Sequence, residues 1–265
     1  MSDLRIFSYL PNPRIWKATI TARLCGVDVE IRGAPTSELP NWLWDFDARH
    51  LSKADKASLP HLARAGVVGL KTTLYKTDAF LQANPFGNVP AAFSPDGAVG
   101  VFESNSIMRA VARLGAATVQ LYGADPFTAS RIDGFLDASL LFSRDVQTYV
   151  LALRAGEIPP AVHSAMRAAM ASYLPGIQRA LSQTSAFLAG PTLSIADICF
   201  FVELSLLFNE YAHRELLRAA GLEPLLSDNC RAQYSVAFGH FDRLRGHEAF
   251  SPDAEAFLKD LTSRG

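Results

Sequence analysis

The chain has 265 residues, of which 49% are hydrophobic and 19% charged, and its formal net charge is -1 at pH 7. This composition indicates a globular protein with a sizeable core, in one large domain or two ordinary ones, and excludes a disordered chain. A net charge this small, without a basic stripe interleaved with aromatic residues, argues against a nucleic-acid partner.

The sequence carries no signal for targeting or for a membrane. Residues 1–5 lack the basic start and apolar core of a signal peptide, and the most apolar stretch, residues 193–208, is too short to span a bilayer. The three cysteines are widely spaced, so no metal site is predicted and core packing is expected for Cys25 and Cys199. We expect a reducing compartment, most simply the cytoplasm.

The first elements form a βαβ unit. Residues 4–9 alternate apolar and polar side chains, which predicts a strand. Prolines break the run, and apolar residues then recur at helical spacing over residues 14–25, with Gly26 suited to end the helix. Residues 27–31 alternate again. The two strands are therefore expected to be parallel, with a right-handed crossover.

Residues 36–76 show no clear period, although residues 42–47 are rich in aromatic side chains. A stretch of this length without regular structure is typical of a functional lid or a partner-facing insert. The other interpretation is a surface segment that its tryptophans pack against the domain, and both interpretations stay open.

Regular patterns return after the insert. Residues 77–83 predict a short helix, and residues 91–93 and 99–102 flank the turn-forming residues 94–97, which predicts a β-hairpin. A helix then opens at residues 103–106 and closes at Gly115.

From residue 126 onward the chain is predicted to be all-helical. The predicted helices follow apolar stripes at helical spacing and span residues 132–153, 161–183, 195–208 and 228–244. The expected fold class is therefore α/β plus all-α, with the boundary in the link at residues 116–126.

Three short segments of the first half carry candidate chemistry. The first is the strand-to-helix turn at residues 9–14. A helix N-terminus presents unpaired N–H groups and partial positive charge, which lowers the pKa of a thiol and holds an anion. Tyr9 and Asn12 can each place a hydrogen-bond donor there, although helix capping also accounts for Asn12.

The second segment is Val89-Pro90, at the entry to the predicted hairpin. A proline at the start of a strand is often trans and lies at the edge of a sheet, because it has no N–H to donate to a neighbouring strand. A cis bond instead turns the Val89 backbone outward, where it can pair with an extended peptide. The residues alone leave the isomer open.

The third segment is Glu103-Ser104, at the opening of a helix. A carboxylate beside a hydroxyl and helix N–H groups can bind the α-ammonium and α-carboxylate of an amino acid together. A capped helix with an acidic first turn is the alternative.

The order of these segments resembles that of the glutathione transferase family, and the likeness is carried by residues 9–17, 84–90 and 102–107. It implies a thioredoxin-like glutathione-binding domain over residues 1–115. It also implies a C-terminal helical bundle over residues 126–265 that binds the second substrate and dimerises, with glutathione as co-substrate.

The resemblance also implies roles for individual residues. The Val89-Pro90 bond is expected to be cis, with the Val89 backbone pairing with the cysteinyl part of glutathione. Glu103 and Ser104 are expected to hold the γ-glutamyl end, and Asn88 matches a position that often reaches the glycyl end.

Thiol activation is assigned to either of two residues. Counting back from Arg14, Tyr9 falls at the position of the family's activating hydroxyl, and Asn12 is the other candidate. A hydroxyl or amide donor stabilises a thiolate without taking its proton.

The helical half adds a match of its own. Residues 193–198 resemble the family's buried capping box, in which Ser194 caps the helix and Asp197 reaches back to it. The role implied for this pair is in folding, not in catalysis.

The resemblance predicts a transferase that adds or exchanges the glutathione thiolate on a hydrophobic aromatic electrophile. Bacterial transferases that cleave the β-aryl ethers of lignin-derived aromatics are similar in general build, and in such chemistry the thiolate displaces a phenolate at carbon. Aromatic side chains nominated for the second-substrate site, each of which is also a candidate for the core, are Trp42, Trp44, Phe142, Tyr149, Phe208 and Tyr211.

Two other functions stay open. Tyr9-x-Pro-x-x-Arg14 together with residues 102–105 is also similar to the transferase-like domain of elongation factor 1 gamma, a non-catalytic scaffold. The third hypothesis is a protein that sequesters hydrophobic ligands. In each case the family build implies a dimer, of identical or related chains, in which the first domain packs against the partner's second.

Overall fold

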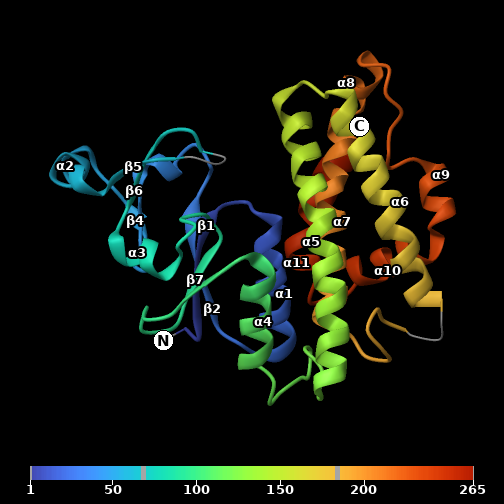
Figure 1. Ribbon diagram of the computed structural model, residues 1–265, viewed down its shortest axis with the longest axis horizontal. Helices are drawn as coiled ribbons and strands as arrows, with labels where there is room; N and C mark the ends of the chain where they lie inside the picture. Colours follow the sequence, from blue (N-terminus) through green and yellow to red (C-terminus); the bar gives the residue numbers. More distant parts are fainter. Residues whose placement is uncertain (1, 67–69, 183–185, 265) are drawn as a thin grey trace. The chain divides into compact units, whose positions relative to one another are not determined.

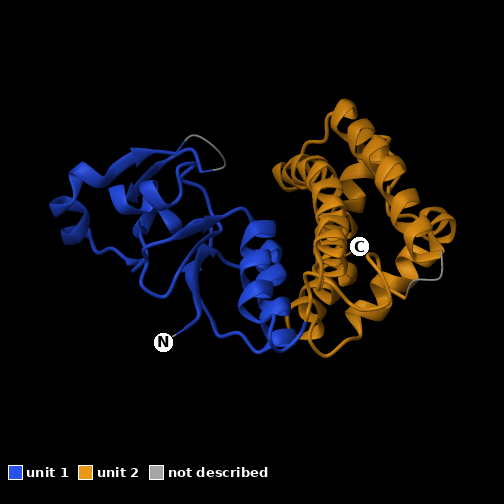
Figure 2. Ribbon diagram, turned by 60° about the horizontal axis from the view of Figure 1, so that its bottom comes forward, with its two compact units in different colours: residues 1–119 blue, residues 120–265 orange. Residues whose placement is uncertain are grey.

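The computed structural model describes residues 2–66, 70–182 and 186–264 (Figure 1). The chain divides into two compact units, unit 1 at Met1–Val119 and unit 2 at Gln120–Gly265 (Figure 2). This division falls inside the 116–126 link. Parts of two sequence predictions, residues 67–69 of the insert and residue 183 of a helix, lie outside the described residues.

Unit 1 is built on a four-stranded sheet in the order β2-β1-β7-β8. Strand β1 pairs in parallel with β2 and antiparallel with β7, and β7 pairs antiparallel with β8. The predicted βαβ unit and hairpin are both present, so the thioredoxin-like prediction is confirmed. The strands are β1 (Leu4–Tyr9), β2 (Val29–Ala34), β7 (Ala91–Phe93) and β8 (Gly100–Phe102).

Helices α1 (Trp16–Cys25) and α4 (Ser104–Leu114) pack against each other in unit 1 (Figure 1). A 3-10 turn, η1 (Pro13–Ile15), leads into α1. Helix α1 ends at Gly26, whose φ of 72° is a left-handed conformation that glycine adopts without steric cost.

Residues 36–76 contain a second four-stranded sheet, in the order β4-β3-β6-β5, which the sequence did not predict. Its strands are only two to four residues long, too short to set a visible alternation. Its elements are η2 (Leu39–Asn41), β3 (Trp42–Trp44), β4 (Arg49–His50), α2 (Lys53–Ser58), η3 (Pro60–Leu62), β5 (Ala63–Ala65) and β6 (Thr73–Lys76).

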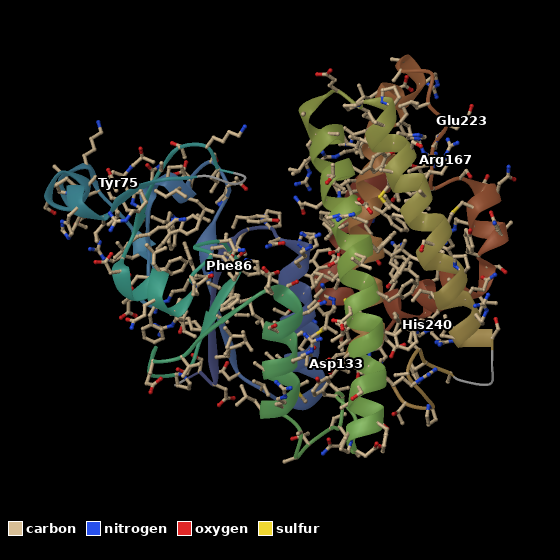
Figure 3. The ribbon with its side chains drawn as sticks, viewed as in Figure 1. Tyr75, Phe86, Asp133, Arg167, Glu223 and His240 are labelled. Atoms are coloured by element: carbon tan, nitrogen blue, oxygen red, sulfur yellow. The ribbon has the colours of Figure 1, made fainter. Side chains whose placement is uncertain are left out.

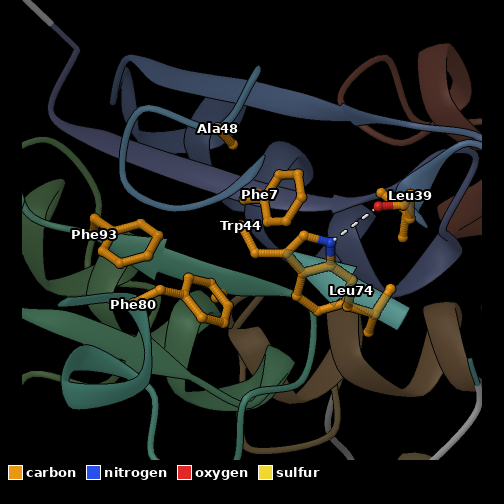
Figure 4. Packing of buried hydrophobic residues seen from close by; sticks show 8 residues of the cluster. Phe7, Leu39, Trp44, Ala48, Leu74, Phe80 and Phe93 are labelled. Carbon is orange, nitrogen blue, oxygen red and sulfur yellow. Dashed lines mark hydrogen bonds between the residues drawn. The ribbon is translucent and has the colours of Figure 1, made fainter. Parts of the chain in front are cut away.

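A cluster of aromatic rings ties this second sheet to the first (Figure 4). Trp44 meets Phe7 edge to face at 5.5 Å between ring centres and Phe80 at 5.9 Å. Its indole Nε1 donates to the carbonyl oxygen of Leu39 at 3.2 Å, so the ring is both buried and hydrogen-bonded. Phe80 comes from α3 (Asp78–Ala83). Packing by tryptophan is therefore observed, and a partner-facing role for the insert stays a prediction.

The described residues of unit 2 form helices and no strand, as predicted, and helix α7 is buried along its whole length. The predicted helix at residues 228–244 is two helices, because Tyr234 has non-helical backbone angles. None of the described helices is both long and apolar enough to cross a membrane. The elements are α5 (Pro126–Ala155), α6 (Pro160–Ser182), α7 (Ile195–Leu207), η4 (Phe208–His213), α8 (Arg214–Ala219), α9 (Asp228–Gln233), α10 (Ser235–Arg245) and α11 (Ser251–Ser263).

The predicted capping box at the start of α7 is confirmed. One carboxylate oxygen of Asp197 accepts from both the backbone N–H and the hydroxyl of Ser194, each at 3.0 Å. Its other oxygen accepts from the backbone N–H of Leu188 at 2.9 Å and lies 2.9 Å from Nε2 of His240, which is labelled in Figure 3. Asp197 thus joins three segments of unit 2 from a fully buried position.

Candidate functional site

The end of β1 lies beside the residues that precede β7. Phe7 pairs with Ala91 in the antiparallel ladder, and continuing that register brings Tyr9 next to Val89. Both side chains pack against the same aromatic cluster. The Val89-Pro90 bond is cis, as the resemblance implied. Within the described residues, no hydrogen bond engages the backbone of Val89, which leaves it available to pair with a peptide.

Glu103 stands immediately before α4 in a strained conformation. Its φ of 68° is the one positive value among the described residues other than glycine. Such a backbone costs on the order of 1–3 kcal/mol and is concentrated at binding and active sites. The carboxylate is exposed, and no described residue forms a hydrogen bond or ion pair with it. It is therefore available to a cationic group.

Behind Glu103, a buried lysine reaches the first turn of α4. Lys17 of α1 is 2% exposed, and its ammonium donates to the Ser104 hydroxyl at 3.3 Å and to Asn105 Oδ1 at 2.7 Å. Lys17 lies in residues 9–17, one of the segments that carry the family resemblance, but no role was predicted for it. Pro90 and Ser104 also line one small space with residues of α1 and η1. The three predicted segments therefore converge within unit 1.

Asn12 is engaged within the protein. Its Nδ2 donates to the Ser8 hydroxyl at 3.0 Å, and its Oδ1 accepts from the backbone N–H of Arg14 at 3.0 Å. These bonds cap the turn that leads into α1, which is the capping role considered from the sequence. Tyr9 lies half-buried at the end of β1. The catalytic assignment to Tyr9 or Asn12 stays a prediction.

A second buried cation lies at the loop that precedes Val89. Lys76, at the end of β6, donates to the carbonyl oxygen of Gly87 at 2.6 Å, and its ammonium sits 4.6 Å from the ring centre of Trp44. Burial lowers the pKa of Lys76 from its ordinary value. Sequence reasoning missed this residue because it lies in the stretch without a period. Exposed Asn88 is held from behind by Asn84, whose amide donates to the Asn88 carbonyl at 2.8 Å.

Most of the aromatic residues nominated for a second-substrate site lie in the core instead. Tyr149 is fully buried, and its hydroxyl donates to Glu210 at 2.8 Å. Phe208 is buried against Phe241 at 5.1 Å. Phe142 lines a groove between α5 and α6. Core packing was the other role considered for each of these residues from the sequence, and it is observed for Phe142, Tyr149 and Phe208.

Together the site offers an exposed carboxylate, a hydroxyl at a helix N-terminus backed by a cation, an unpaired backbone segment and a second cation. This arrangement suits a short extended peptide with an amino acid group at one end and a carboxylate at the other.

No protein-family model matches the chain. Its sequence is similar to "Probable elongation factor 1-gamma 1" of Arabidopsis thaliana, with 30% identity over 174 residues, which covers 60% of this chain and 40% of the relative. Elongation factor 1-gamma of Trypanosoma cruzi is 32% identical over 123 residues, or 44% of this chain and 27% of the relative. The chain thus spans less than half the length of these relatives.

Solved structures of glutathione transferases resemble the chain over nearly its whole length. A glutathione transferase from Methylobacillus flagellatus, with glutathione bound, superposes with a TM-score of 0.64 at 14% identity, covering 95% of this chain and 98% of that one. Glutathione transferase F2 of Populus trichocarpa superposes with a TM-score of 0.63 at 17% identity, covering 99% and 100%. At these identities the likeness establishes the fold. The chain has the glutathione transferase fold, as its sequence predicted.

Proposed function

We propose that this protein is a glutathione transferase whose glutathione site lies in unit 1. The observation that carries the proposal is the pair Glu103 and Ser104, where a strained backbone presents an unpaired carboxylate beside a hydroxyl at the N-terminus of α4. The carboxylate suits the α-ammonium of a γ-glutamyl group, and the hydroxyl and helix N–H groups suit its α-carboxylate.

The cysteinyl part of glutathione would pair with the Val89 backbone in the manner of an added strand. Because the register places Val89 beside Tyr9, the thiol would come close to the end of β1. The Tyr9 hydroxyl is our first candidate for stabilising the thiolate, with Asn12 as the second. Each unit by which the thiol's pKa falls corresponds to about 1.4 kcal/mol of preferential thiolate binding.

The glycyl end is assigned to Asn88 and Lys76. Asn88 is exposed and its carbonyl is fixed by Asn84, and the ammonium of Lys76 lies 2.6 Å from the carbonyl oxygen of the preceding residue, Gly87. A buried ammonium is costly for folding alone. A carboxylate bound beside Lys76 would offset that cost.

The second substrate in this proposal is a hydrophobic aromatic electrophile, such as a β-aryl ether of lignin-derived aromatics. With an ether, the thiolate attacks carbon, the carbon–oxygen bond breaks and the phenolate leaves with the electron pair and takes up a proton. This assignment rests on the resemblance to the bacterial ether-cleaving transferases. We place the reaction in a reducing compartment, most simply the cytoplasm, because the three cysteines are widely spaced.

We also propose a dimer of identical or related chains. The side chain of Phe86, labelled in Figure 3, is 73% exposed in unit 1. Unit 2 carries a groove of about 690 Å³ between α5 and α6, floored by Phe142 and Tyr173, whose rings stack at 4.4 Å. Phe86 of each protomer is assigned to the α5–α6 groove of its partner.

A non-catalytic scaffold or ligand-binding protein is the second candidate. It is favoured by one specific observation, that sequence relatives of the chain are elongation factor 1 gamma proteins. Such a scaffold would keep the fold and perform little chemistry.

Calorimetric titration with glutathione tests the proposal. Saturable binding, followed by turnover of aromatic electrophiles that include a β-aryl ether, is the expected result. Binding without turnover of any electrophile would favour the ligand-binding reading, and no binding would favour the scaffold.

A further inference from the structure

We infer that unit 2 carries a second binding site, which takes a small zwitterion, an amino acid or a short peptide with free ends. The site is a pocket of about 550 Å³, a volume typical of small-molecule sites. Helix α8 contributes Arg214 and Arg218 to its lining, and the segment that follows α8 contributes Glu223 and Asp228. The inference does not depend on the proposed glutathione site, which lies in unit 1.

Two like charges on α8 line this pocket. Arg214 and Arg218 are four residues apart in the helix, a spacing that brings their side chains together and destabilises a pair of like charges. Arg218 is paired with Glu215, but no described carboxylate pairs with Arg214. A carboxylate bound beside the two guanidinium groups would offset their repulsion.

Arg214 is half-buried and leaves hydrogen-bonding capacity unused. Its Nη2 donates to the carbonyl oxygen of Leu226 at 3.3 Å, and its guanidinium lies 4.3 Å from the ring centre of Tyr211. Its Nε is buried without a hydrogen-bond partner among the described residues, and its Nη1 donates to none of them either. The protein alone therefore satisfies little of this guanidinium, and a ligand carboxylate is a strong acceptor for such a group.

The acidic residues of the pocket are not paired with the basic ones. Glu223, labelled in Figure 3, and Asp228 are exposed, and neither forms an ion pair with a described residue. Opposite charges that line one pocket without pairing match a ligand that carries both charges. The carboxylate of the ligand is therefore assigned to Arg214, and its ammonium to Glu223 and Asp228.

The segment that carries Glu223 is held in place from within unit 2. The carboxylate of Glu210, which is fully buried, accepts from the backbone N–H groups of Leu225 at 3.0 Å and Leu226 at 2.7 Å. Nε2 of His163 lies 2.9 Å from the carbonyl oxygen of Glu223. Because these bonds order the segment in the free protein, the ligand does not have to order it, which lowers the entropic cost of binding.

Calorimetric titrations with trialanine and two capped forms test the inference. Trialanine carries both charges, N-acetyl-trialanine lacks the ammonium, and trialaninamide lacks the carboxylate. Trialanine should bind about tenfold more tightly than either capped form. Alanine, titrated in parallel, distinguishes a site for a single amino acid from a site for a peptide.

Variants separate the two ends of the site. Arg214→Gln should lose the preference for trialanine over trialaninamide, and Glu223→Gln combined with Asp228→Asn should lose the preference over N-acetyl-trialanine. Should Arg214→Gln not fold, Arg218→Gln tests the basic end at an exposed side chain. Arg179→Gln is the matched control, because it removes the same charge from an exposed position on α6 that does not line the pocket, and it should leave every affinity unchanged.

Equal affinities for the three peptides, or no binding of trialanine and alanine, would overturn the inference. Trialanine that binds the Arg214→Gln variant as tightly as the wild type, but no longer binds Glu103→Ala, would belong to the proposed glutathione site. That outcome would also refute the pocket in unit 2.

Discussion

The ammonium of Lys76 and the carbonyl oxygen of Gly87 are joined by a 2.6 Å hydrogen bond that links the second sheet of unit 1 to the loop before Val89. The sequence pattern gave no hint of this link, because β6 belongs to a stretch without visible periodicity. It brings a buried cation to the segment that we assign to the glycyl end of glutathione.

The first prediction is a loss of affinity at alkaline pH. Burial lowers the pKa of Lys76 below its ordinary 10.5, so the stability of the free protein rises with pH through the window between the lowered pKa and 10.5. A carboxylate ligand needs the ammonium, so its binding has the opposite sign and weakens, by up to about tenfold, as pH rises through the lowered pKa. Calorimetry with S-methylglutathione, whose sulfur has no proton to lose, measures this.

The Lys76→Arg variant is the matched control, because arginine keeps its charge throughout this range while every other group still titrates. Its affinity for S-methylglutathione should fall less than that of the wild type. If the affinities of the two proteins changed equally with pH, Lys76 would not bind the glycyl carboxylate.

The second prediction separates binding from backbone strain at Glu103. Glu103→Ala removes the carboxylate but keeps a side chain at a φ of 68°, and Glu103→Gly removes both the carboxylate and the strain. Neither variant should be retained on immobilised glutathione, and Ser104→Ala should not be retained either. The glycine variant should be about 1 kcal/mol more stable than the alanine variant in urea unfolding. Unchanged retention of either Glu103 variant would count against the assigned site.

The third prediction distinguishes Tyr9 from Asn12. Tyr9→Phe should raise the pKa of bound glutathione's thiol and lower turnover, because it removes the hydroxyl that we assign to the thiolate. Asn12→Ala should instead cost about 1 kcal/mol of stability, since it removes the cap on Arg14 N–H and the bond to Ser8. The ultraviolet absorbance of the thiolate, titrated with pH, reports the thiol pKa. If neither variant lowers turnover, backbone donors or another group must activate the thiol.

The sequence predicted those elements of unit 1 whose residues show a clear alternation or turn pattern. The alternation at residues 4–9 and the turn at residues 94–97 identified β1 and the hairpin, and the helix between β1 and β2 indicated their parallel pairing. The four strands of the second sheet are too short for such a pattern. They are held by the packing of Trp44 against Phe7 and Phe80, which are contacts between residues distant in sequence.

The residues of the candidate site that lie in short motifs could likewise be predicted from the sequence. Glu103, Ser104 and Val89 were identified because family motifs mark them. The hydrogen bonds of Lys17 to Ser104 and Asn105 depend on how α1 packs on α4, and packing between residues so distant in sequence leaves no local pattern. Tyr149 was a candidate both for the substrate site and for the core, and the structure shows the second, because its hydroxyl donates to Glu210 in a buried hydrogen bond.

The fourth prediction concerns the buried carboxylate at the start of α7. Asp197→Ala should lower the free energy of unfolding by about 3 kcal/mol, because it orphans the backbone N–H groups of Ser194 and Leu188 and leaves Nε2 of His240 without its partner. Ser194→Ala should cost only about 1 kcal/mol, as a lost cap. Urea unfolding of the two variants measures the difference. Equal costs would mean that Asp197 acts only through the capping box.

The fifth prediction tests the proposed dimer through Phe86. Replacing Phe86, 73% exposed, with serine should shift the protein toward monomer in analytical ultracentrifugation, because the groove between α5 and α6 of the partner would lose its apolar occupant. Phe127→Ser is the matched control, since Phe127 is 88% exposed and does not line the groove, so its sedimentation should equal that of the wild type. Gly134→Trp, which fills the groove, should reproduce the effect of Phe86→Ser. A Phe86→Ser protein that stays dimeric would refute this interface.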